Sequence, residues 1–500
     1  MKIKRTSGIL LHITSLPSKF GVGDFGPAAF AFADFLAKAR QGCWQMLPVN
    51  PPAIDVPHSP YNCASAFAGN PLLISPQLLY RRGLLGREDI RQLPHFPETK
   101  VNFGRVIGFK RKLLNAAFRN FSGRPTQTAY TEFCQNNKAW LDDFAFFIAL
   151  RDLYKTGNWR RWPAELRDRR KDALASFRRK HRKAIEKQKF MQYIFFRQQA
   201  FLKLYCNKLG IRIIGDIPIY VSYKSADVWA NPQFFKLNGA KKPAFVSGVP
   251  PDFFSKTGQL WGNPIYDWRA LKRKGYSWWL DRIGHNLQMF DIVRIDHFRA
   301  LIAYWQIPAH HKTAVKGKWI RAPKDDFFRK VLERFPSCPF VVEDMGNITP
   351  AVRAFIKKHK LAGMRVLQFG LGAGDKTNPH APRNHVKNCV VYTGTHDNNT
   401  TTGWFENELT DDQRQKLSRR PWWGKSDDEL HWRFVRLAMN SPANLAIIPM
   451  QDILGLGQDG RMNLPGTFSE KNWVWRMAPG RITPSITRKL ARITRAANRA

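Results

Sequence analysis

The sequence predicts an α/β fold, a closed (β/α)8 TIM barrel, and three features carry this prediction. Eight short apolar runs recur along the chain, helical patterns lie between most of them, and acidic residues stand where several runs end. Short runs rich in Ile, Val and Leu are typical of strands that are buried on both faces of a parallel sheet. Strands that alternate with helices form either a closed barrel or an open doubly wound sheet.

The eight runs set the order of the predicted barrel strands. They lie at residues 8–12, 43–48, 211–220, 290–297, 339–344, 363–369, 389–394 and 443–450. No G-x-G-x-x-G motif follows the first run, which disfavours the open sheet of dinucleotide-binding proteins. We therefore expect the eight strands to close on one another.

Helical spacing of apolar residues fills most of the gaps between the runs. Residues 27–40 begin with Pro27, place Phe32 and Leu36 on one stripe, and are followed by Gly42. A second pattern precedes the third run and ends at Gly210, a typical helix terminator. This pattern spans 194–209. Similar patterns precede the fourth, fifth, sixth and eighth runs, at 271–289, 324–334, 350–358 and 427–439.

The runs are unevenly spaced, which indicates insertions. About 160 residues separate the second run from the third, too many for one crossover connection. We expect one catalytic barrel over 1–500, with a mostly helical insertion at 50–205, a second insertion or loop at 220–268 and a basic C-terminal tail at 477–500. In the tail, Ile486, Leu490 and Ile493 have helical spacing, which predicts a basic amphipathic helix lying on the barrel.

Composition narrows the class of protein. No apolar run reaches the roughly 18–20 residues that span a bilayer, and the apolar stretch near the N-terminus is short for a signal peptide. We therefore expect a cytoplasmic protein without a membrane partner. The 6 cysteines are scattered without a C-x-x-C pair, so free thiols are expected rather than disulfides or a metal site.

The charge is strongly positive: 81 Lys and Arg stand against 38 Asp and Glu, a formal net charge of +43. Such a surface attracts polyanions, so a nucleic-acid-binding protein is one alternative function. No DNA- or RNA-binding motif is visible, and the basic residues are spread along the chain. We expect any nucleic-acid binding to be non-specific and lost at moderate salt.

Acidic residues stand at the ends of four runs, where a barrel gathers its chemistry. Asp216 follows IIG, Asp296 ends IVRID, Glu343 and Asp344 end VVED, and Asp397 follows YTGTH. Fully buried carboxylates are rare unless they are paired or functional. Four of them on one rim therefore indicate a catalytic site.

The types of residue on this rim are suited to glycosidic bonds. Arg294 and Asp296 are two apart on a strand, so both side chains leave the same face, and the guanidinium lowers the pKa of the carboxyl. Cleavage or transfer of a sugar needs one ionised and one protonated carboxyl group. A third acid holds sugar hydroxyls and stabilises positive charge; His396 either assists it or has a structural role.

Aromatic residues are consistent with a sugar substrate. The chain has 17 Trp, whose faces stack on pyranose rings or fill the core. Trp261 lies in the polar, glycine-rich stretch SKTGQLWGNPIY. This stretch is expected to be a mobile loop over the mouth of the barrel, with Trp261 exposed on it.

The same segments give the sequence a family resemblance. SGILLHITSLPSKFGVGDFG, GDIPIYVSYKSADVWANPQFF, RIDHFRA, VVEDMG and YTGTHDNNTTTGW resemble the 4-α-glucanotransferase family, also called amylomaltases or disproportionating enzymes. The resemblance covers about residues 7–476, and the segments occur in the family's order. It implies an α-amylase-like barrel with helical insertions that transfers α-1,4-glucan segments with retention, through a covalent glycosyl-enzyme intermediate.

The resemblance also implies roles for nine residues. Asp296 matches the nucleophile, Glu343 the general acid/base and Asp397 the transition-state stabiliser. Tyr61, Asp216, Arg294 and His396 match residues that bind the scissile glucose. Gln259 and Trp261 match residues of the loop over the glucan. We expect burial and neighbouring acids to raise the pKa of Glu343. Asp344 is the alternative acid/base.

Partners follow from the family as well. The resemblance implies maltooligosaccharides and starch- or glycogen-type α-glucans as substrates, and neither a metal ion nor an organic cofactor. An α-glucan hydrolase on the same barrel is the nearest alternative, because the chemistry is shared until water or a sugar hydroxyl attacks the intermediate.

Overall fold

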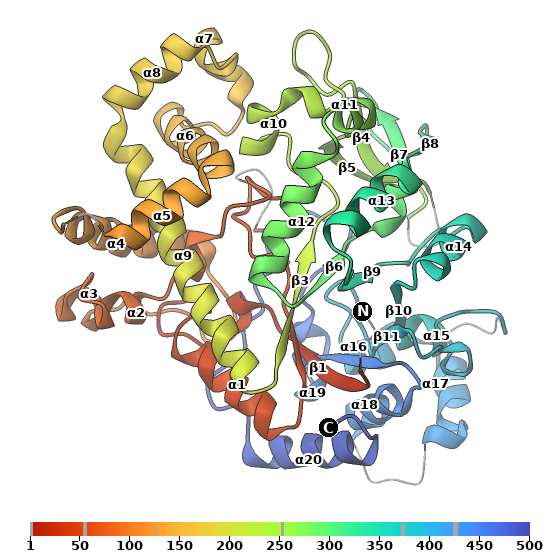
Figure 1. Ribbon diagram of the computed structural model, residues 1–500. Coiled ribbons are helices and arrows are strands. Elements are labelled where there is room, and N and C mark those ends of the chain that lie inside the picture. Colours follow the sequence, from red (N-terminus) through yellow and green to blue (C-terminus); the bar gives the residue numbers. More distant parts are fainter. Residues whose placement is uncertain (1–3, 54–57, 126, 252–254, 372–375, 424–428) are drawn as a thin grey trace.

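The computed structural model describes residues 4–53, 58–125, 127–251, 255–371, 376–423 and 429–500. At its centre, eight parallel strands form a closed barrel (Figure 1), which confirms the predicted fold class. Each strand overlaps one of the eight apolar runs. Around the barrel, in chain order, they are β1 (Thr6–Leu10), β2 (Cys43–Gln45), β3 (Arg212–Ile217), β6 (Ile292–Ile295), β9 (Phe340–Val342), β10 (Ala362–Val366), β11 (Cys389–Tyr392) and β12 (Leu445–Pro449).

Pairing of β1 with both β2 and β12 closes the barrel. Gly8 lies opposite Cys43 on one side and Ile447 on the other. A Cβ atom at Gly8 would lie 2.4 Å from the carbonyl oxygen of Cys43, so this crossing needs glycine. The Ile and Val side chains of the strands are almost fully buried, which explains why the strands have near-continuous apolar sequences.

Helices cover the outside of the barrel, and most predicted ones are present. α1 (Pro27–Lys38), α13 (Lys324–Arg334) and α14 (Pro350–Lys358) lie where expected, and α9 (Arg182–Lys208) extends further towards the N-terminus. The pattern at 271–289 forms two helices, α11 (Trp268–Arg273) and α12 (Ser277–Met289), because Gly275 and Tyr276 both have positive φ. α18 (Leu430–Asn440) begins later than predicted, and positions 427 and 428 lie outside the described residues.

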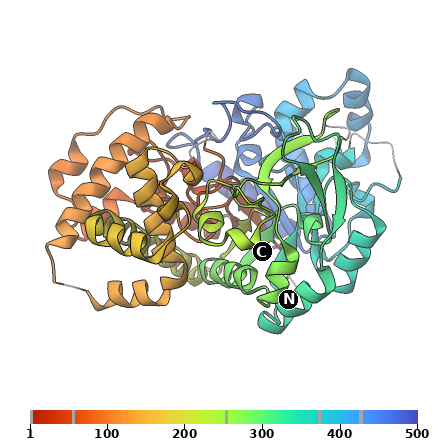
Figure 2. The same ribbon diagram turned by 90° about the horizontal axis from the view of Figure 1, so that it is seen from above.

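The stretch between β2 and β3 is mostly helical and lies beside the barrel, where Figure 2 shows its orange and yellow helices on one side of the molecule. Its last helix, α9, packs against α1, α4, α5 and α6. This arrangement supports the proposal that 50–205 is an insertion. The helices before α9 are α2 (Pro76–Arg81), α3 (Arg87–Arg91), α4 (Phe103–Ser122), α5 (Thr128–Asn136), α6 (Lys138–Tyr154), α7 (Ala164–Arg167) and α8 (Lys171–Lys180).

A second sheet, which the sequence analysis did not predict, stands beside the barrel. Its strands are antiparallel in the order β5 (Gln259–Pro264), β4 (Phe245–Val249), β7 (Ala303–Pro308) and β8 (Lys318–Arg321). The expectation that SKTGQLWGNPIY is a loop is therefore wrong for Gln259–Pro264. Val249 pairs with Gln259 and Gly248 with Leu260, so β4 satisfies backbone groups that a loop would leave to solvent.

The C-terminal tail ends in α20 (Pro484–Ala496), which packs against α1 and α18 and buries Leu490 and Ile493. The predicted amphipathic helix on the barrel is thus confirmed. The short helices α10 (Ala226–Ala230), α15 (Leu367–Leu371), α16 (Thr401–Asn407), α17 (Asp411–Ser418) and α19 (Met450–Ile453) complete the connections. Over the described residues, no helix is both long and apolar enough to cross a bilayer.

Candidate active site

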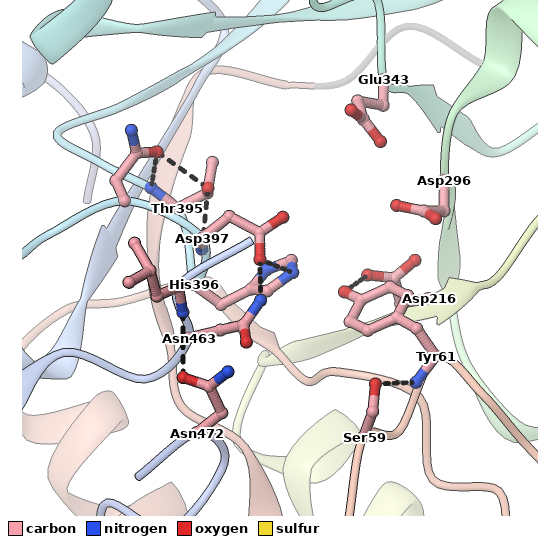
Figure 3. Close-up of polar contacts among 12 residues, drawn as sticks. Ser59, Tyr61, Asp216, Asp296, Glu343, Thr395, His396, Asp397, Asn463 and Asn472 are labelled. Atoms are coloured by element: carbon pink, nitrogen blue, oxygen red, sulfur yellow. Dashed lines mark hydrogen bonds and ion pairs between the residues drawn. The ribbon is translucent and has the colours of Figure 1, made fainter. Parts of the chain in front are cut away.

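The C-terminal ends of three barrel strands bring the predicted catalytic residues together. Arg294 is the third residue of β6 and Asp296 directly follows that strand, while Glu343 directly follows β9. Asp397 lies in the turn after β11. Figure 3 shows Asp296 and Glu343 on one side of the site, facing Asp397 across it.

Arg294 joins three carboxylates and is almost completely buried. Its Nη1 lies 2.6 Å from Oδ2 of Asp216 and 2.9 Å from Oδ1 of Asp296, and its Nη2 donates to Oε2 of Glu343 over 2.8 Å. The predicted contact of Arg294 with Asp296 is confirmed. A planar guanidinium can hold several oxygens in fixed directions, which a lysine cannot do.

Asp216 is held on two sides at the end of β3. Arg294 contacts both of its oxygens, and the hydroxyl of Tyr61 donates to Oδ2 over 2.7 Å. Burial raises the pKa of Asp216, and the charge of Arg294 opposes that rise. The ring of Tyr61 also stacks on that of His396, at 5.0 Å and an interplanar angle of 12°. Asp216 and Tyr61 are therefore held in fixed positions beside Arg294 and His396.

Asp296 and Glu343 share a hydrogen bond and both contact Arg294, so their pKa values depend on each other. Burial and the adjacent charge of Glu343 raise the pKa of Asp296, although Arg294 opposes them. Burial acts to raise the pKa of Glu343 as well, but Arg294, a hydrogen bond with Asp296 and the backbone N–H of His297 together lower it. The lowered pKa of Glu343 differs from the expected rise, because the carboxylate accepts bonds from Arg294 and from the N–H of His297.

Asp397 faces the other two acids and is the most accessible of the three, with 44% of its side chain exposed. Nδ2 of Asn463 donates to its Oδ1 over 2.7 Å, and Nε2 of His396 lies 3.4 Å from the same oxygen. Arg461 donates to its backbone carbonyl over 3.0 Å. Asp397 is thus fixed in direction while its second oxygen is open to a ligand.

His396 is buried beside Asp397, and burial lowers its pKa. A second histidine, His12, lines the same pocket at the ends of β1, β11 and β12, and burial lowers its pKa to about 3. Both rings are therefore neutral near pH 7. A neutral imidazole can accept one hydrogen bond and donate another, which suits sugar hydroxyls.

Sequence reasoning missed four residues of this region. His12 lines the site from the end of the first apolar run, whereas Arg461, Asn463 and Trp473 contact or line it from the loop 461–473, after the last barrel strand. The ring centroid of Trp473 lies 5.8 Å from the centroids of both Tyr61 and His396.

Gln259 and Trp261 lie on β5 at the edge of the site. Trp261 is 36% exposed, as predicted, and its Nε1 donates to Oε1 of Gln259 over 3.2 Å. Its ring lies almost perpendicular to that of His297, at a centroid distance of 4.8 Å. Because His297 follows Asp296, this strand brings an exposed aromatic face next to the candidate nucleophile.

Asp344, the alternative acid/base, pairs with residues of β10 instead. It is buried, its Oδ2 lies 2.9 Å from Nη1 of Arg365, and its Oδ1 accepts the backbone N–H of Met364 over 2.7 Å. These bonds hold the carboxyl against β10 and make it a structural ion pair. Within the described part of the chain, no group of three or more His, Cys, Asp or Glu residues is arranged to hold a metal ion.

Comparison with known proteins agrees with this geometry. The profile of a family described as 4-alpha-glucanotransferase matches residues 11–483. The 4-alpha-glucanotransferase of Synechocystis sp. is 44% identical over 98% of this chain and 97% of its own length, and that of Thermus thermophilus is 42% identical over 100% of both.

Solved structures show the same likeness. An amylomaltase from Streptococcus agalactiae in complex with acarbose has a TM-score of 0.96 at 36% identity, over 99% of this chain and 100% of its own. The amylomaltase of Corynebacterium glutamicum, at 19% identity and a TM-score of 0.79 over 99% of this chain and 75% of its own, shares the fold.

Proposed function

Because the chain belongs to the 4-α-glucanotransferase family, a family of retaining enzymes, we propose the part that each residue of the site plays in transfer. The observation that carries the proposal is the position of Arg294 between Asp216, Asp296 and Glu343, opposite Asp397. Two carboxyls of unequal proton affinity on one side and a third acid facing them match the needs of retaining chemistry on a glycosidic bond.

In the first step Asp296 attacks the anomeric carbon of the donor. The bond from that carbon to the glycosidic oxygen breaks, the oxygen takes a proton from Glu343, and the sugar is left as an ester on Asp296. Asp397 and His396 bind hydroxyls of this sugar, and the charge of Asp397 stabilises the positive charge that develops on the ring.

This step needs Glu343 in its protonated form and Asp296 in its ionised form. In the free enzyme Arg294 and the N–H of His297 both donate to Oε2 of Glu343 and lower the pKa of this carboxyl. When Glu343 turns towards the glycosidic oxygen it loses these donors, and burial then raises its pKa. Asp296 keeps Arg294 as its partner and becomes the ionised nucleophile.

In the second step the hydroxyl of another glucan replaces the leaving sugar. Glu343, now ionised, takes the proton of that hydroxyl, the oxygen attacks the anomeric carbon, and the ester bond to Asp296 breaks. Two inversions give net retention. Trp261 and Gln259 cover the bound glucan and limit the access of water to the ester, which favours transfer over hydrolysis.

The family acts on α-1,4-glucans, and we propose maltooligosaccharides and starch- or glycogen-type glucans as the substrates of this enzyme. The related amylomaltase from Streptococcus agalactiae, solved in complex with acarbose, supports this proposal.

Incubation with maltotriose alone tests the proposal. Transfer gives glucose together with maltooligosaccharides longer than maltotriose, whereas a hydrolase gives only shorter products. Asp296→Asn serves as the matched control, since it should abolish both activities. Products that are only shorter than maltotriose would contradict the proposal.

A further inference from the structure

One loop, residues 461–473, starts and ends in the active site. At its beginning Asn463 donates to Oδ1 of Asp397 over 2.7 Å and Arg461 to the backbone oxygen of Asp397 over 3.0 Å. At its end the ring of Trp473 lies beside those of Tyr61 and His396. The part between these anchors must therefore lie at the rim of the site.

The tip of the loop faces the strand that covers the site. Gly466 has a φ of 73°, which lets the chain turn, and a Cβ atom placed on it would lie 4.0 Å from Cγ of Gln259. The loop thus comes close at Gln259 to β5, the strand that also carries Trp261.

Internal hydrogen bonds hold the tip in one shape. The buried side chain of Asn472 accepts the N–H of Leu464 over 3.1 Å and donates to the backbone and side-chain oxygens of Thr467 over 3.2 and 3.1 Å. The hydroxyl of Thr467 donates to the carbonyl of Leu464 over 2.6 Å. Such a loop loses little conformational entropy when it binds a ligand.

This ordered tip presents an apolar ring to solvent. Phe468 is 81% exposed, the highest value among the large apolar side chains of the described residues, and Leu464 nearby is 46% exposed. The flanking residues 465–467 and 470–471 are exposed as well and are mostly polar or small. The apolar surface is therefore too small for a stable protein–protein interface, which needs about 800 Å² from each partner.

We propose that Phe468 is a stacking platform for a glucose unit that lies beyond the scissile bond, and that it makes the enzyme favour long glucans. The flat face of a glucose ring carries C–H groups that pack on an aromatic face, and stacking there removes the exposed ring from water. The proposal rests on the function given above, since the ligand is the same glucan that Asp296 and Glu343 cut.

The test compares donors of different length with the full-length enzyme. Phe468→Ala should raise KM for a long linear maltodextrin by about 3- to 10-fold and leave kcat unchanged, whereas Phe468→Trp should keep the wild-type KM. The rate of the first step with α-glucosyl fluoride, a single glucose unit, should not change in either variant. Phe201→Ala, at a ring 61% exposed on α9, is the matched control and should change no parameter.

The outcomes separate this inference from the proposed function. An equal KM for the long maltodextrin in wild type and Phe468→Ala would overturn the platform while leaving transfer intact. An equal effect of Phe468→Ala on α-glucosyl fluoride would overturn it too, because this donor has no glucose unit beyond the scissile bond to stack on the ring. If the wild-type enzyme failed to make longer products from maltotriose, the proposed function itself would be wrong.

Discussion

Replacing Arg294 with Gln probes the charge balance on which the site depends. The guanidinium lies within 2.6–2.9 Å of Asp216, Asp296 and Glu343. An opposite charge this close lowers a carboxyl pKa by about 1–3 units, and each unit corresponds to about 1.4 kcal/mol. Without it, the nucleophile accepts its proton more readily. We expect the acid limb of the pH profile of kcat/KM to move up by about 1–2 pH units.

The same substitution should destabilise the fold in a pH-dependent way. Burial already raises the pKa of Asp216, and the variant loses the charge that opposes it. A carboxyl whose pKa is higher in the folded than in the unfolded protein costs stability above its folded pKa, and the cost vanishes below its unfolded pKa. We expect Arg294→Gln to lose about 3–5 kcal/mol at pH 8 and progressively less as the pH falls towards 4.

Denaturant unfolding and initial transfer rates between pH 4 and pH 8 measure both effects. Arg329→Gln is the matched control, because Arg329 pairs with Asp326 and Glu333 on the exposed face of α13 and such pairs contribute little. A loss of stability that does not vary with pH, together with an unmoved acid limb, would refute the assignment of Arg294 as the shared counter-charge.

Three further substitutions test the remaining parts of the site. Glu343→Gln should lower the first-step rate by orders of magnitude for natural glucans. The loss should be much smaller for α-glucosyl fluoride, because the fluoride leaving group needs little acid. Equal losses would show that another group protonates the leaving sugar. Trp261→Ala should raise the ratio of hydrolysis to transfer with maltotriose, and an unchanged ratio would mean that the ring does not limit water. Asn463→Ala removes the 2.7 Å hydrogen bond to Asp397 and should lower kcat/KM by about 10-fold while the melting temperature stays the same. An unaltered kcat/KM would show that Asn463 does not position Asp397.

The barrel could be predicted from the sequence because its strands are buried on both faces. Runs such as IVRI and CVVY have no polar alternation and are separated by helical patterns, which leaves few other folds. The antiparallel sheet could not be predicted in the same way. β5 has the sequence QLWGNP, in which Gly262 and Pro264 hide any alternation, and only pairing with β4 makes it a strand.

The residues of the active site also differ in how far the sequence predicts them. Asp216, Asp296 and Glu343 were predictable because each stands at the end of a buried strand, where a carboxylate needs a reason to be present. Asn463 was not, since it reaches the site from a loop without a periodic signal. His12 ends the first apolar run, where a lone histidine is more often structural than functional. The lowered pKa of Glu343 could not be predicted, because spacing places Arg294 beside Asp296, and only the fold shows that its second Nη and the N–H of His297 both donate to Glu343.

The central claim, that Asp296 forms the covalent bond to the sugar, has a direct test. Glu343→Gln, incubated with α-glucosyl fluoride without an acceptor, should accumulate the ester because it lacks the base for the second step. Digestion and mass spectrometry should then find one glucosyl unit on the peptide that contains Asp296, and none when Asp296 is also changed to Asn. A glucosyl unit on Asp216 or Asp397, or a labelled peptide that survives Asp296→Asn, would contradict the account.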